Sequence, residues 1–200
     1  VRYYDVVFNG VEGTAEQEYA GWNRASSGDY AWDVTDIVDA GTEGYDVTVS
    51  YGCDVDGDAG LYMLEWSGSV VFSGLGVAGY PAIPSDPRMY LPREGDMDAT
   101  GSWTYRYTED LDFMGLAVTV TSSGRYTEEG YDSLRLPDSV RYDAYHLTNE
   151  YTLDIGGNLL EGTLDQWYVE GLGLVEETNY LSDGSLVMSR EITSWSGLSP

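Results

Sequence analysis

Hydrophobic and polar residues alternate along much of the chain, most clearly at positions 45–51. The odd-numbered residues of this run are Tyr or Val, and the even-numbered residues are Asp, Thr and Ser. Alternation with a period of two and one polar face is typical of a half-buried antiparallel strand. Similar alternation recurs at 103–108 and 116–121, so the chain is predicted to form strands.

The most regular stretch, Ser139–Trp195, divides into four runs of strand length. Glycine-bearing turns separate these runs at 156–157, 171–173 and 182–184, and no run has the 3.6-residue spacing of a helix. This pattern predicts an antiparallel meander. Apolar residues change from even to odd positions near Ala144, which indicates a β-bulge and a curled sheet. The predicted fold is all-β, with about 10–12 strands closing into a barrel or an open, clam-like half-barrel.

Length and proline content predict how the chain is divided. Two hundred residues suit one all-β domain, here 1–200. Four of the six prolines lie at 74–100, so an irregular Gly/Pro-rich loop is expected there. Residues 11–28 are polar and are predicted to be a loop with a short strand at Glu18–Trp22.

The charge balance limits the partners. Thirty-five acidic residues oppose nine basic ones, all arginine, for a net charge of −26. Such a chain repels nucleic-acid phosphate and anionic membranes, so neither is an expected partner. No run of 18 apolar residues is present, so no membrane span is expected. So large a negative charge is typical of adaptation to a saline or calcium-rich setting, where counterions screen self-repulsion. The acids are spread along the chain, which disfavours the alternative of a DNA mimic.

One acidic string has the spacing of a calcium loop. Counted from Asp54, carboxylates fall at positions 1, 3, 5 and 12, which are Asp54, Asp56, Asp58 and Glu65. Ala59 stands where such loops have glycine, and strands flank the string. Two interpretations remain open, a calcium site and a solvated acidic turn; no other cofactor is expected.

No constellation points to catalysis. The only histidine, His146, is predicted to be an exposed strand residue, and no Gly-x-Ser-x-Gly elbow presents a serine to it. The only cysteine, Cys53, is predicted to be a small buried hydrophobe. The six tryptophans are expected to fill the core. Thirty-five acids leave paired carboxylates for glycan hydrolysis open as an alternative.

Three groups of motifs together resemble a known family. They are Tyr51-Gly-Cys53, then Leu91-Pro92 followed by Trp103-Thr-Tyr105, and finally Trp167-Tyr168-Val-Glu-Gly171-Leu-Gly173-Leu-Val175. This set resembles the TapB-like family of uncharacterised exported bacterial proteins, many of them lipoproteins. The resemblance implies an exported β-barrel, periplasmic or at the cell surface, akin to lipid-carrier shells, and it implies no catalytic residues.

The last of these motifs also has a structural interpretation. Gly171 and Gly173 can adopt positive φ and allow close backbone approach at a hairpin, with Trp167 and Val175 on the strands beside it. Three functional hypotheses follow. The first is a non-catalytic exported β-barrel protein that binds an apolar, lipid-like ligand. The alternatives are a calcium-stabilised surface or adhesion module and a carboxylate-based glycan hydrolase.

Overall fold

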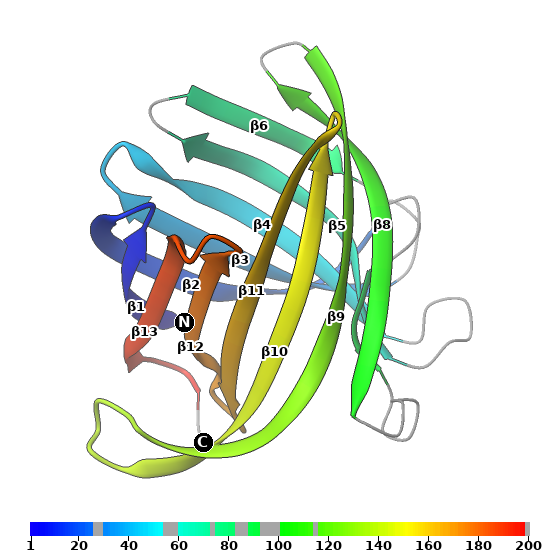
Figure 1. The fold of residues 1–200 in the computed structure, drawn as a ribbon. Helices are drawn as coiled ribbons and strands as arrows, with labels where there is room; N and C mark the ends of the chain where they lie inside the picture. Colours follow the sequence, from blue (N-terminus) through cyan, green and yellow to red (C-terminus); the bar gives the residue numbers. More distant parts are fainter. Residues whose placement is uncertain are drawn as a thin grey trace.

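Antiparallel strands make up nearly all of the chain in the computed structural model, which describes residues 1–25, 30–53, 60–72, 75–82, 88–92, 101–113 and 116–198 (Figure 1). These residues form thirteen strands and no helix, so the all-β prediction is confirmed. The described part of the chain therefore offers no helix of the length and hydropathy needed to cross a membrane. The strands are β1 (Arg2–Phe8), β2 (Val11–Arg24), β3 (Tyr30–Ala40), β4 (Glu43–Cys53), β5 (Gly60–Phe72), β6 (Leu75–Ala82), β7 (Arg88–Pro92), β8 (Ser102–Phe113), β9 (Leu116–Arg135), β10 (Arg141–Ile155), β11 (Asn158–Val169), β12 (Gly173–Leu181) and β13 (Leu186–Trp195).

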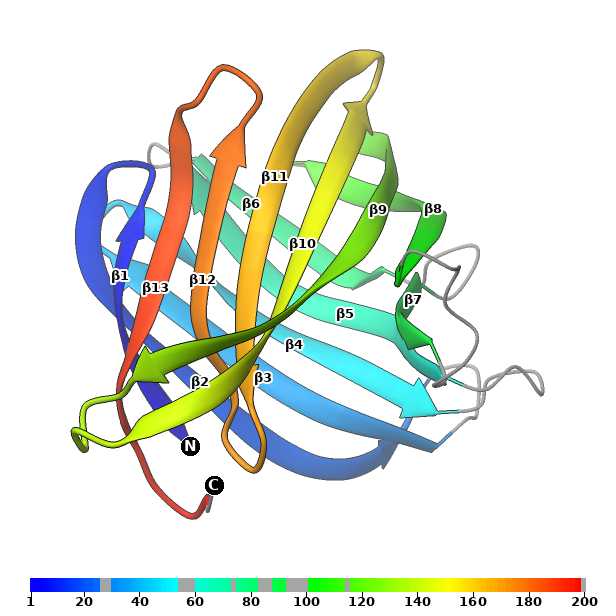
Figure 2. The same ribbon diagram turned by 60° about the horizontal axis from the view of Figure 1, so that its bottom comes forward.

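One sheet contains all of these strands and curls back on itself. Its order is β4-β3-β2-β1-β13-β12-β11-β10-β9-β8-β6-β5-β7, and β4 also pairs with β5, which joins the two ends of the order. The first strand therefore lies beside the last, β13. Strands β6 and β8 meet at a single residue pair, Ala78 and Asp112, so closure is weakest there. The predicted curled half-barrel is confirmed (Figures 1 and 2).

The predicted meander is present as β10 to β13, but the prediction for residues 11–28 is wrong. Instead of a loop with a strand at 18–22, β2 runs without a break from Val11 to Arg24, because β1 and β3 pair with it on both sides. Its alternation is hard to see in the sequence, since the inward side carries small or polar residues such as Ala15 and Gln17.

The proline-rich stretch 74–100 contains two strands, β6 and β7. Strand β7 pairs only with β5, and its last residue is Pro92. An edge strand tolerates proline because one side of its ladder needs no hydrogen bonds. The remainder of this stretch lies outside the described residues.

Two clusters of buried side chains fill separate parts of the interior. The first joins β1, β2, β3 and β13 and is built around Tyr4, Val6, Phe8, Val38 and Ile192. The second joins β5, β8, β9 and β10 and consists of Met63, Trp103, Tyr105, Tyr107, Tyr126 and Leu147. Trp103 stacks on Tyr126 with 5.1 Å between ring centroids. The first cluster thus mixes aliphatic and aromatic side chains, whereas aromatic rings predominate in the second.

The far end of the β9–β10 ribbon curls over the ends of β11 and β12 (Figure 2). A register shift does occur in this ribbon, between His146 and Leu147, but the extra residue is Glu129 of β9. The change of apolar face near Ala144 has a second cause. Ala144 is fully buried in the cluster that also holds Val169 and Val175, so the outward face of β10 is covered there.

The β4–β5 ladder depends on a glycine that cannot be replaced without strain. Gly68 has φ 142°, and a Cβ there would lie 2.0 Å from the carbonyl oxygen of Asp46. We expect Gly68→Ala to lower the free energy of unfolding by about 2 kcal/mol or more, because overpacking adds to backbone strain. Urea unfolding of the variant, with the exposed neighbour substitution Ser67→Ala as control, measures this. Equal midpoints for the two variants would contradict it.

Candidate functional site

Inside the half-barrel lies a cavity of about 630 Å³ that opens to solvent. About eight strands give a barrel whose side chains just fill it, and a ring of more strands leaves space. Aliphatic and aromatic side chains provide most of the lining, and a few polar residues interrupt it. The lining includes Val34, Val47, Val49, Leu61, Met63, Leu164, Leu174, Tyr19, Trp32, Tyr45, Tyr51, Trp66, Tyr107, Tyr126 and Tyr168 as apolar or aromatic residues, and Arg2, Gln17, Asp36, Glu109, Gln166 and Arg190 as polar ones.

A row of aromatic rings leads from the cavity to solvent. Tyr19 and Trp32 line the cavity with ring centroids 5.0 Å apart, and Trp22 stacks on Trp32 at 5.7 Å. Trp22 is 74% exposed, so the prediction that the tryptophans fill the core is wrong for this residue, although Trp103 is buried. Aromatic rings in such a row offer flat apolar surface at the entrance to the cavity.

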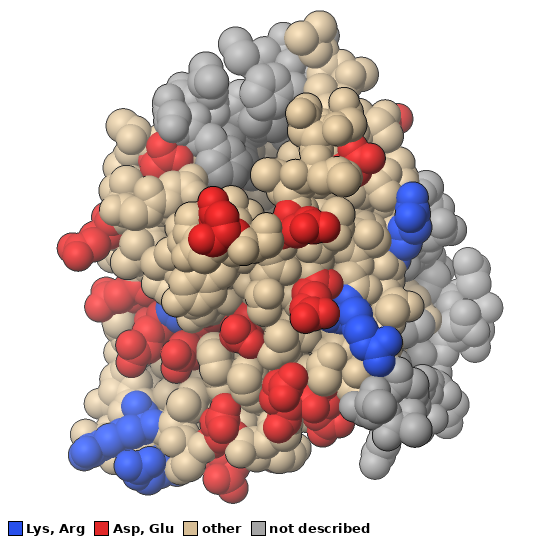
Figure 3. Space-filling model, viewed as in Figure 1, with Lys and Arg blue, Asp and Glu red and all other residues tan. Residues whose placement is uncertain are grey.

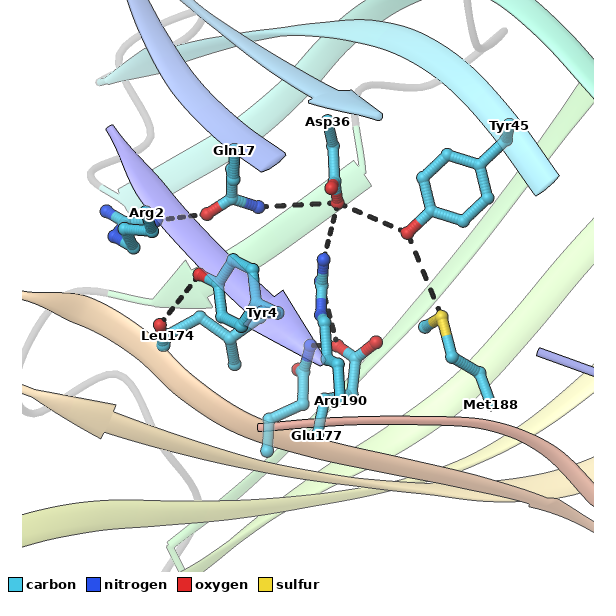
Figure 4. A network of polar contacts seen from close by, with 10 residues as sticks. Arg2, Tyr4, Gln17, Asp36, Tyr45, Leu174, Glu177, Met188 and Arg190 are labelled. Carbon is cyan, nitrogen blue, oxygen red and sulfur yellow. Dashed lines mark hydrogen bonds and ion pairs between the residues drawn. The ribbon is translucent and has the colours of Figure 1, made fainter. Parts of the chain in front are cut away.

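A buried network of charges crosses the polar end of the cavity (Figure 4). Arg190 of β13 contacts Asp36 of β3 at 2.7 Å and Glu177 of β12 at 3.4 Å. Glu177 also accepts a hydrogen bond of 2.5 Å from Gln166. Burial by itself lowers the pKa of Arg190, but the two carboxylates outweigh it and raise that pKa well above its usual value. Arg190 is therefore a permanent cation that joins three strands.

Tyrosine side chains complete this network. Tyr45 donates to Asp36 at 3.3 Å, and Tyr4 donates to the carbonyl of Leu174 at 2.9 Å. Burial raises the pKa of Tyr45 well above 10 and raises that of Tyr4 as well, and in both cases it outweighs the opposing effect of the Arg190 charge. Asp36 Oδ1 and Arg190 Nε are buried with no partner among the described residues, so the network has free hydrogen-bonding capacity.

Arg2 is a second buried arginine at this end of the cavity, and its surroundings differ. Its guanidinium donates to the Leu172 carbonyl, the Gln17 side chain and the Tyr19 hydroxyl, and it lies 4.6 Å from the centre of the Tyr19 ring. Sequence reasoning missed this residue. Its position could have indicated its burial, because Arg2 lies on the same face of β1 as the buried residues Tyr4, Val6 and Phe8.

The glycines of the last motif make room for Arg2. Gly171 and Gly173 have φ values of 75° and 80° and lie at the turn between β11 and β12. A Cβ on Gly173 would lie 2.5 Å from Arg2 Nη2, so only glycine leaves space for the guanidinium. Trp167 and Val175 lie on the strands either side of the turn.

The other predicted residues fall in different places. Asp54, Asp56 and Asp58 lie outside the described residues, and Glu65 lies in β5 opposite Ser50, so calcium binding stays a prediction. Cys53 is exposed, contrary to its prediction. It is the last residue of β4, beyond the buried clusters.

The prediction that His146 is an exposed strand residue is also wrong. Its side chain is 18% exposed, and its two nitrogens lie 3.2 Å from carboxylates of Asp132 and Asp165. It stacks on Trp167 at 4.3 Å, and Trp167 in turn donates to Asp132 at 2.8 Å. Asp132 lies on β9, two residues beyond the Gly130 that pairs with His146, whereas Asp165 and Trp167 lie on β11 at the other side of β10. Sequence spacing does not reveal these strand pairings. None of the contacts of His146 within the described chain is with a serine, so no Ser–His–acid triad is formed.

The fold and the cavity together define a β-half-barrel with a hollow, largely apolar interior. No family model and no curated protein matches the sequence, so the TapB-like resemblance stays a prediction. Two solved structures are similar at low identity. A candidate lipoprotein from Parabacteroides distasonis has a TM-score of 0.46 and 10% identity, covering 99% of this chain and 95% of that one. A candidate exported protein with a YmcC-like fold from Bacteroides fragilis has a TM-score of 0.49 and 11% identity, covering 100% and 94%.

The Arg190 network predicts a large effect of removing its cation. Arg190→Met leaves Asp36 and Glu177 buried without a counter-charge, and we expect the free energy of unfolding to fall by about 3–5 kcal/mol. Arg141→Met removes the same charge from an exposed position at the end of the ribbon and is the matched control, expected to change stability by less than about 0.5 kcal/mol. Urea unfolding measures both variants. If the free energy of unfolding fell equally in both, the effect would come from net charge and not from the buried ion pairs of Arg190.

Buried Tyr45 predicts loss of stability in alkali. Its pKa is raised in the folded state, so the unfolded chain loses this proton first, near the ordinary tyrosine pKa of about 10. The stabilisation is complete below that pH and is lost as the pH rises toward the folded-state pKa. Unfolding free energies measured from pH 8 to 11.5 at constant ionic strength are expected to fall above pH 10. The fall is expected to be less steep in Tyr45→Phe, and an equal slope in both proteins would refute this assignment.

Proposed function

We propose that this protein is a non-catalytic binding protein that holds an apolar, lipid-like small molecule inside its half-barrel. The cavity of about 630 Å³ carries this proposal. Its size lies within the roughly 300–1,000 Å³ typical of small-molecule sites, and its mainly apolar lining with a few polar groups at one end is also typical of them. Burying ten methylene groups would contribute about 8 kcal/mol before the costs of association.

The carboxylates of the cavity support binding over glycan hydrolysis. Asp36 and Glu177 are both engaged by Arg190, and Glu109 accepts a hydrogen bond of 2.6 Å from Trp66. A glycosidase needs one carboxylic acid with a raised pKa near a second carboxylate. Glu176 has a pKa raised first by burial and then by Glu191, but it does not line the cavity. The carboxylates that line the cavity thus favour ligand binding over glycan hydrolysis.

Export to the periplasm or cell surface is the second part of the proposal. It is supported by the motif resemblance and is compatible with the acidic surface. Figure 3 shows acidic side chains spread over the face formed by β9 to β13, with only a few arginines among them. A net charge of −26 disfavours adsorption to anionic lipid, so the proposed ligand is held by the cavity and not by surface attraction.

Blocking the cavity tests the proposal. Leu164 of β11 lines the cavity, whereas Leu159 of the same strand is 65% exposed. We expect the unchanged protein to bind the apolar fluorescent probe N-phenyl-1-naphthylamine at one equivalent. Leu164→Trp is expected to weaken binding at least tenfold because the indole occupies the space, and Leu159→Trp is expected to bind as the unchanged protein does. Absence of probe binding, or equal binding by the two variants, would overturn the proposal.

A further inference from the structure

We infer that the ligand is a long-chain acid whose carboxylate pairs with Arg2 at the polar end of the cavity. This inference rests on the proposed function and adds the chemistry of the head group. It starts from the difference between the two arginines that line the cavity: Arg190 is matched by two carboxylates, and Arg2 is matched by none among the described residues.

Burial makes the lack of a counter-ion at Arg2 costly. The residue is 2% exposed, and its hydrogen-bond partners are a backbone carbonyl, an amide and the hydroxyls of Tyr19 and Tyr4, all neutral. A guanidinium removed from water keeps its charge and gains most from an anion that it can bind directly. The cavity that Arg2 lines is the one place from which a ligand could supply that anion.

The guanidinium also has an unused donor. An arginine has five N–H groups, one on Nε and two on each terminal nitrogen. Leu172, Gln17 and Tyr19 each accept one of them, and Tyr4 makes a further side-chain hydrogen bond with the same guanidinium. At least one N–H therefore remains for an oxygen of a ligand carboxylate.

The nearest carboxylate of the network does not take this place. Asp36 is separated from Arg2 by Gln17, which donates to Asp36 at 3.4 Å and accepts from Arg2. Asp36 is bound to Arg190 at 2.7 Å. Both acids of the network thus neutralise the same arginine, and the positive charge at Arg2 is left for the ligand.

The opposite wall sets the direction of the ligand. Glu109 lies on β8, across the half-barrel from β1, and also lines the cavity. A carboxylate head would be repelled by Glu109 and attracted by Arg2, so the apolar chain is expected to extend toward Leu61 and Met63. The negative surface opposes the approach of any anion, but at 0.15 M salt charges beyond about 8 Å are largely screened.

Ligands of equal chain length and different head charge test the inference in the unchanged full chain. Hexadecanoate, hexadecan-1-ol and hexadecyltrimethylammonium are each used to displace N-phenyl-1-naphthylamine at pH 8 and 0.15 M NaCl. We expect hexadecanoate to bind at least tenfold more tightly than the alcohol, and the cation to bind most weakly. Equal affinities for acid and alcohol, or tightest binding of the cation, would overturn the inference while leaving the proposed function intact. Failure of all three to bind would overturn the proposed function itself.

A variant identifies the residue responsible. Arg2→Gln is expected to reduce hexadecanoate affinity to that of hexadecan-1-ol and to leave alcohol affinity unchanged. Arg141→Gln, which removes an exposed arginine, is expected to change neither. If Arg2→Gln keeps the preference for the acid, Arg2 is not the anchor. If the variant fails to fold, the ligand series on the unchanged chain still decides whether the cavity prefers an anion.

Discussion

Pairing of β4 with β5 is the constraint on which the cavity depends. Alternate side chains of a strand point to opposite faces of its sheet. When the sheet curls round and its strands pair with one another, its inner face is shielded from solvent. Every inward residue then has to be apolar, or polar with a partner. The ring is too wide for its side chains to fill completely, so a cavity that opens to solvent remains beside the two buried clusters.

The polar network keeps this hollow in shape. Asp36 comes from β3, whereas Glu177 and Arg190 are paired across β12 and β13, so the ion pair between Arg190 and Asp36 joins facing walls of the half-barrel. Buried ion pairs add little net stability compared with apolar packing, but they are selective in geometry. A network of this kind holds the two walls at one separation. Apolar contacts alone have no fixed direction and would let the walls move closer together. Arg2, placed beside it through Gln17, supplies the charge that the network does not neutralise.

The sequence predicted the strands and turns correctly where their conformation depends on residues close together in the chain. The alternation at 45–51 and the glycine turn at 171–173 depend on neighbours in the chain, and both indicate strands and hairpins directly. Prediction failed where distant parts meet. Strand β2 is held by partners on both sides, and His146 lies between carboxylates of its two neighbouring strands, Asp132 of β9 and Asp165 of β11. The cavity could not be predicted, because it depends on the width of the closed ring. The alternation of β1 in the sequence indicates that Arg2 points inward. It does not indicate that Arg2 has no carboxylate partner.

The central claim is that the middle of the half-barrel is hollow and accepts an alkyl chain. The most direct measurement is a crystal structure of the protein grown with a sixteen-carbon alkyl ligand that carries a terminal bromine, with the bromine located by anomalous scattering. We expect one strong bromine peak inside the sheet, among the side chains of Val47, Leu61 and Leu164. An interior filled by the protein's own side chains, with bromine only on the outer surface, would contradict it.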